Sequence, residues 1–68
     1  MTKTIDKKEI LKALITESKR RLVVQELMVE YYQKKSLQNA QFEPHLKTAE
    51  IDKKATKDIL EFYESKLK

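Results

Sequence analysis

The feature that most constrains this chain is the absence of glycine: none of its 68 residues is Gly, and Pro44 is its single proline. Gly is the usual residue where a backbone makes a left-handed turn or approaches a ligand closely. It is also part of the phosphate-binding loops of the Walker and dinucleotide motifs, which this chain cannot form in their usual shape. The many Lys, Glu, Leu and Gln residues favour helices, so the sequence predicts an all-α protein.

The length indicates one small domain over residues 1–68. A chain this short buries a limited fraction of its surface and is usually stabilised by disulfides, a metal, oligomerisation or close helix packing. There is no Cys and only one His, which excludes disulfides, thiolate metal sites and His-rich metal sites. We therefore expect helix packing or oligomerisation to provide the stability.

Composition also bears on the compartment. Charged residues make up 38% of the chain and hydrophobic residues 40%. No apolar run approaches the roughly 18 residues that suggest a membrane span. The start, Met1-Thr2-Lys3-Thr4, lacks the apolar core of a signal peptide. The lack of Cys fits a reducing compartment, and we expect a cytoplasmic protein without a membrane partner.

A first helix is predicted over about residues 6–37. Asp6 is a suitable N-cap, with Glu9 placed to complete a capping box and Ile5 and Ile10 placed to form a hydrophobic staple. No helix breaker follows until Asn39. A continuous helix of this length would be roughly 48 Å long.

The apolar pattern of this helix changes along its length. An initial stripe rotates after Leu22, and residues 22–32 are apolar around most of the helix circumference. A helix of this kind must be covered on more than one side. Either the helix breaks near residues 19–21 and two shorter helices pack together, or one long helix lies between two partners. We favour the second alternative because no residue between 16 and 22 breaks helices.

A connection over about residues 38–47 and a second helix over about residues 48–67 complete the predicted fold. Pro44 could be the first residue of this helix, with Thr48 and Asp52 as alternative N-caps. The prediction is a helical hairpin that dimerises into a helical bundle, because the second helix covers only one side of the first. A second copy of the chain is the simplest cover for the remainder, and a different protein is the alternative.

The predicted dimer or partner interface lies within residues 22–32, where the first helix is apolar around most of its circumference. Leaving such side chains in water forgoes about 1.5–3 kcal/mol each of burial free energy. The residues assigned to this interface are Val23, Val24, Leu27, Met28, Tyr31 and Tyr32.

The basic cluster Lys19, Arg20 and Arg21 is the one charged feature that suggests a partner. Residues 1–21 carry seven basic and three acidic side chains, so the whole net charge of +4 lies in the first third of the chain. Such a cluster can contact nucleic-acid phosphates or an acidic protein surface. A solvated helix face is the simpler interpretation.

No group of residues indicates catalysis. His45 is alone, without Cys or a carboxylate at metal-ligand spacing, and is interpreted as an exposed loop residue. The carboxylates of the second helix alternate with Lys, which is typical of a solvated face. We expect no catalytic, metal or cofactor site and no small-molecule substrate. The sequence favours a non-enzymatic regulator or inhibitor that docks on a partner protein; the alternative is a small nucleic-acid-binding regulator that uses the basic first third.

Overall fold

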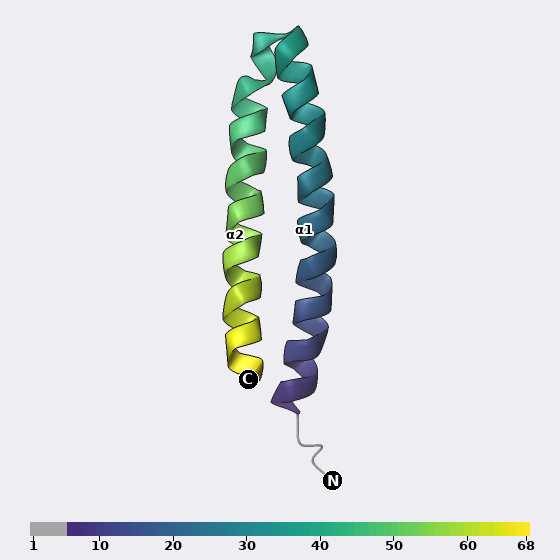
Figure 1. Cartoon of the computed structure of the whole chain (residues 1–68), viewed down its shortest axis with the longest axis vertical. Helices are drawn as coiled ribbons and strands as arrows, with labels where there is room; N and C mark the ends of the chain where they lie inside the picture. Colours follow the sequence, from purple (N-terminus) through teal and green to yellow (C-terminus); the bar gives the residue numbers. More distant parts are fainter. Residues whose placement is uncertain (1–5) are drawn as a thin grey trace.

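A computed structural model describes residues 6–68 of the chain as two long antiparallel helices joined by a short turn (Figure 1). The order is α1 (Lys7–Gln38), a 3-10 turn η1 (Ala40–Phe42) and α2 (Glu43–Leu67). The hairpin is elongated: its radius of gyration is 16.4 Å, against about 11 Å for a compact domain of this length. The predicted all-α hairpin is confirmed.

Helix α1 begins where the sequence places its cap. The Asp6 carboxylate accepts a hydrogen bond of 2.9 Å from the backbone N–H of Lys8, and the backbone N–H of Ile10 donates to the Asp6 carbonyl. Ile5, the other half of the predicted staple, lies outside the described residues. The helix continues without interruption through residues 19–21, as the lack of a breaker predicts.

The connection is much shorter than predicted. We expected residues 38–47 to form it and the second helix to begin near residue 48, but α2 already begins at Glu43. Pro44 lies in the first turn of α2, where a helix needs no N–H donor, so it starts the helix rather than delaying it. The early start also places His45 on a helix rather than in the predicted loop.

The turn needs no glycine because no residue of the described chain has a positive φ. Asn39 is extended, with φ −151° and ψ 116°, and its N–H donates to the carbonyl of Lys35 at 2.8 Å. Its side chain accepts from the N–H of Gln41 at 3.0 Å, and its carbonyl accepts from the N–H of Phe42 at 3.1 Å. One extended Asn therefore ends α1 and starts η1.

The two helices meet along a seam in which contact residues alternate at spacings of four and three. Every member of this seam is buried or half-buried. The spacing is that of a coiled coil, in which such residues stay on the face toward the partner helix. In α1 the seam consists of Leu11, Ile15, Ser18, Leu22, Gln25, Val29, Tyr32 and Ser36. In α2 it consists of Phe42, Leu46, Ala49, Lys53, Thr56, Leu60, Tyr63 and Leu67.

The seam also defines the register of the hairpin. At the closed end, Tyr32 stacks on Phe42 and on His45, with ring centroids 6.4 Å and 5.6 Å apart. At the open end, Leu11 and Leu67 line one hollow. Counting seam residues from Leu11 opposite Leu67 places Ser18 opposite Leu60 and Leu22 opposite Thr56. The same count places Tyr32 opposite Leu46, next to His45 and one seam position from Phe42.

Candidate interaction surface

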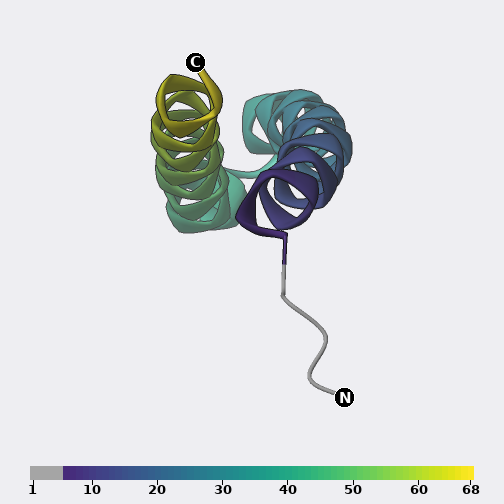
Figure 2. The ribbon, with the colours of Figure 1, turned by 90° about the horizontal axis from the view of Figure 1, so that it is seen from below.

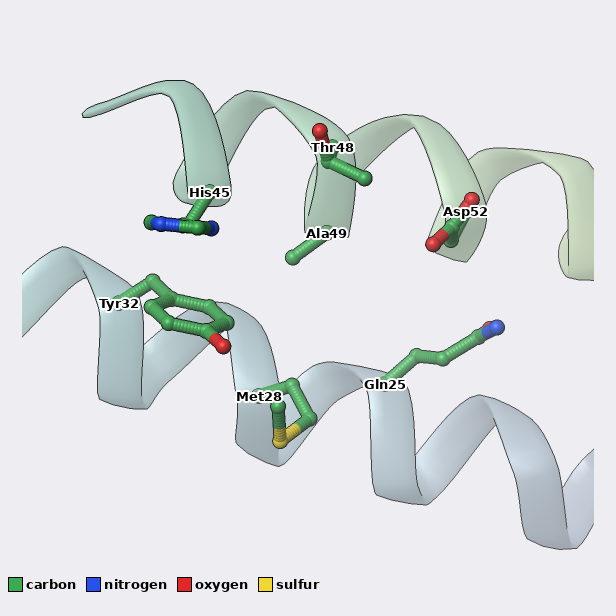
Figure 3. Close-up of a pocket in the computed structure, with 7 residues that line it drawn as sticks. All are labelled: Gln25, Met28, Tyr32, His45, Thr48, Ala49 and Asp52. Atoms are coloured by element: carbon green, nitrogen blue, oxygen red, sulfur yellow. The ribbon is translucent and has the colours of Figure 1, made fainter. Parts of the chain in front are cut away.

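The seam leaves one side of the hairpin apolar and the other polar. In each helix, the residue directly before a seam residue points to one side and the residue directly after it points to the other. Because the helices are antiparallel, the preceding residues of both helices lie on the same side. A hollow of about 240 Å³ shows this arrangement: Met28 from α1 lines it together with His45, Thr48 and Asp52 from α2 (Figure 3).

Six of the ten large, exposed apolar side chains of residues 6–68 lie on the side that carries the preceding residues; Val23 and Leu37 lie on the opposite side, and Leu27 and Ile51 point away from the seam. We call the side that carries the preceding residues the apolar face and define it by Ile10, Leu14, Val24, Met28 and Tyr31 of α1 and Ala55, Ile59 and Phe62 of α2. Val24, Ile59 and Phe62 are 52%, 46% and 57% exposed. Charged side chains also lie along this side, among them Glu17, Arg21 and Asp52.

The opposite side, which we call the polar face, is mostly charged. Its members are the residues that follow each seam residue, from Lys12 and Lys19 in α1 to Glu64 and Lys68 in α2. Lys19, Glu64 and Lys68 line a shallow hollow there with Ile15 and Leu67. The two helices lie side by side in both views, so each of these faces extends over both helices (Figures 1 and 2).

Lysine side chains lie over two aromatic rings of the apolar face. The Nζ of Lys35 lies 5.7 Å from the centroid of the Tyr31 ring, and the Nζ of Lys66 lies 5.5 Å from that of Phe62. A cation over an aromatic face contributes about 0.5–1 kcal/mol at an exposed site. Both residues remain about half exposed beneath these lysines, at 51% for Tyr31 and 57% for Phe62.

The structure distributes the predicted interface residues over several sides of α1. Val24, Met28 and Tyr31 lie on the apolar face, whereas Val23 lies on the polar face and is 55% exposed. Leu27 points away from the seam and is 59% exposed. Tyr32 is half-buried in the seam, where it contacts residues of the same chain.

The basic cluster is divided in the same way, because consecutive helical residues point in directions about 100° apart. Lys19 lies on the polar face, where it lines the hollow beside Glu64. Arg20 and Arg21 line a different hollow with Glu17 and Val24. The three side chains therefore do not form one basic surface.

Sequence reasoning missed the members of the apolar face that lie outside residues 22–32: Ile10, Leu14, Ala55, Ile59 and Phe62. The signal was present, because the residues before each seam position repeat at the same alternating spacing as the seam itself. It was obscured because the seam contains polar residues, among them Ser18, Gln25, Lys53 and Thr56. Only the position of α2 shows that these polar residues are the inner ones.

Neither helix of residues 6–68 is long and apolar enough to cross a membrane. In the same residues, no group of three or more His or carboxylate side chains is arranged to hold a metal ion. Comparison of the chain with models of protein families, with curated proteins and with solved structures finds no match.

Proposed function

We propose that this protein is a non-enzymatic interaction module, a small regulator or inhibitor that acts by docking its apolar face on another protein. The observation that supports this most strongly is that six of the ten large, exposed apolar side chains of residues 6–68 share one side of the hairpin. Exposed apolar residues scattered singly are normal, whereas a contiguous patch bounded by polar residues is typical of a protein interaction site. Two aromatic residues and a methionine in this face fit that role, because these residue types are enriched in interfaces.

In the absence of another partner, the proposed cover of this face is a second copy of the chain, which gives a homodimeric helical bundle. The hairpin by itself has a small core: its buried apolar residues are Ile15, Val29 and Leu60. A chain with so little buried surface gains stability when another chain covers its apolar residues. When the chain docks on a different protein, that protein would then replace the second copy of the chain on the apolar face.

Val23 and Val24 provide a matched test of the proposal. They are adjacent, identical in type and almost equally exposed, at 55% and 52%, but they lie on opposite faces. Val24→Glu should weaken self-association at least about tenfold, since burying a side chain of this size is worth about 1.5 kcal/mol or more. Val23→Glu should leave it unchanged. Sedimentation equilibrium at micromolar concentration measures both effects.

The same two variants test docking on another protein. Used as baits in an extract of the native host, wild type and Val23→Glu should retain the same proteins, and Val24→Glu should lose them. Equal capture by all three, or equal association of both variants with themselves, would show that the apolar face is not the interaction surface.

Nucleic-acid binding through Lys19, Arg20 and Arg21 is the alternative function. It requires the three side chains to reach the same duplex, and the division of the cluster between two faces of α1 argues against this. Phosphate binding has a separate signature, because its affinity falls steeply with salt, whereas apolar docking does not.

A further inference from the structure

The apolar face of α1 has a sequence pattern that is complementary to its own reverse: read backwards, apolar residues coincide with apolar residues, and the acidic and basic residues exchange places. From residue 10 to residue 28 the residues that precede the seam are apolar, apolar, acidic, basic, apolar and apolar: Ile10, Leu14, Glu17, Arg21, Val24 and Met28. In a two-fold contact, residue i of one copy meets residue j of the other, and j meets i. A pattern of this kind is therefore complementary to itself when two copies lie antiparallel.

We infer that the second copy binds with its α1 antiparallel to the first, about a two-fold axis near residue 19. This inference rests on the proposed function and specifies its dimer. Ile10 then meets Met28 of the second copy, and Leu14 meets Val24. Glu17 meets Arg21 twice, once on each side of the axis. Every apolar residue of the set faces an apolar residue, and every charge faces its opposite.

Helix α2 supports the same axis independently. Ser18 lies opposite Leu60 in the seam, so an axis near residue 19 crosses α2 close to Ile59. The apolar part of α2 on this face is short and centred there: it consists of Ala55, Ile59 and Phe62. The axis therefore brings these three residues against the same residues of the second copy. The two-fold axis thus passes close to the middle of the six-residue pattern in α1 and of the apolar part of α2.

Other registers place charges against apolar side chains. If α1 of the second copy is moved by seven residues along α1 of the first, Glu17 lies against Met28 and Arg21 lies against Val24. A further shift of seven sets Leu14 against Gln38, the last residue of α1, and leaves Ile10 beyond the end of that helix. In the alternative dimer, α1 packs on α2 of the second copy with the ends of the two hairpins at the same level. This arrangement sets Glu17 against Ile59. Of these arrangements, the axis near residue 19 is the one that pairs all six residues of the pattern with suitable partners; Tyr31, outside the pattern, then lies opposite Lys7.

The exposed area fits a chain that pairs with a copy of itself. The chain exposes 5992 Å². A compact protein of its mass, 8.1 kDa, would expose about 4500 Å². The excess exceeds the approximately 800 Å² that each partner buries in an interface of standard size. Stacking two hairpins through their apolar faces would give a four-helix bundle that removes much of this excess.

Glu17 and Arg21 are also i, i+4 neighbours within α1, so the test must separate a contact across the axis from a contact within one helix. Glu17 and Arg21 are exposed in the hairpin, so both can be replaced without disturbing the seam. Glu17→Arg alone sets Arg against Arg across the axis, and Arg21→Glu alone sets Glu against Glu. Each variant should self-associate about tenfold more weakly than wild type, because like charges across an interface are unfavourable.

Mixing the two single variants in equal amounts should restore association, because both arginines of the Glu17→Arg chain then face glutamates of the Arg21→Glu chain. The intrahelical pair cannot explain this result, since each chain still carries two like charges. Sedimentation of each variant and of the mixture measures it, with circular dichroism as the control for folding. A dimeric wild type without recovery in the mixture would overturn the register but leave the proposed function intact. A wild type that stays monomeric in this assay would overturn the dimer itself.

Cysteine cross-linking tests the register without changing charge, and the chain has no Cys of its own. Leu14→Cys mixed with Val24→Cys should form a disulfide-linked heterodimer in an oxidising buffer. Each variant alone should not, because its two Cys residues would lie about 15 Å apart along the helices, beyond the roughly 7 Å that a disulfide spans. Cross-linking of Leu14→Cys with itself would indicate another register and overturn the inference.

Discussion

At the scale of single residues, the seam differs from a simple hydrophobic core in having polar residues at its centre. Gln25 shows this most clearly: its Oε1 is buried and accepts no hydrogen bond from any of residues 6–68. Figure 3 shows its side chain extending from α1 along the hollow that Asp52 also lines. A buried polar atom without a partner costs about 1–3 kcal/mol. A polar residue at a coiled-coil contact position can also specify the register at the expense of stability.

Replacing Gln25 with Leu should therefore raise the free energy of unfolding by about 1–2 kcal/mol, since it removes the unpaired oxygen and adds apolar contact. Urea unfolding at one fixed protein concentration measures the change. Gln33→Leu is the control, because Gln33 is exposed on the polar face; it should change stability by less than about 0.5 kcal/mol. A destabilised Gln25→Leu protein would mean that the amide has a partner in solution.

At the scale of the elements, the connection shows how a chain without glycine reverses direction. Asn39 combines an extended backbone with a side chain that accepts from the N–H of Gln41, so a single residue ends α1 and caps η1. The rings of Tyr32, Phe42 and His45 pack together beneath this turn. The turn and these ring contacts therefore hold the start of α2 against the end of α1.

Asn39→Ala should destabilise the hairpin by about 1 kcal/mol, the usual cost of removing a capping side chain. Thermal unfolding followed by circular dichroism measures this loss. Gln41→Ala is the matched control: only its backbone N–H takes part in the cap, so the bond survives the substitution. A loss of equal size in both variants would assign the effect to η1 in general rather than to the Asn39 cap.

At the scale of the whole molecule, the distribution of charge separates the two candidate functions. The net charge of +4 is modest, and the hairpin presents Lys19 on a different face from Arg21. The polar face carries both signs, because Lys and Glu are interspersed along it. A surface of this kind keeps a small protein soluble but provides no continuous track for a phosphate backbone.

We therefore expect weak binding to duplex DNA at physiological salt, and little change when Lys19, Arg20 and Arg21 are all replaced with Gln. Gln is a good helix former and none of the three residues is in the seam, so the fold should be retained. Fluorescence anisotropy with one labelled duplex at two salt concentrations measures the binding. Tight binding by wild type, with a salt slope that flattens in the triple variant, would instead support the nucleic-acid function.

Local sequence signals were sufficient to predict the helices. Without glycine and with one proline, the chain had few positions at which a helix could end, and Asp6 and Asn39 marked both ends of α1 to within a residue or two. These are local effects, decided by backbone geometry and by hydrogen bonds between near neighbours. The start of α2 was misplaced because Pro44 fits either a break or a first helical turn, and neighbouring residues do not distinguish the two.

Which apolar residues face inward depends on the packing of one helix against the other. Val29 and Val24 are the same residue type in the same helix, yet one is buried and the other is exposed. Polar Ser18 and Gln25 occupy the seam, while Ile10 and Phe62 remain outside it. The reason is that each helix has two stripes with the same spacing, one beside the other. The register against the partner helix selects between them, and that register depends on contacts between residues far apart in the chain.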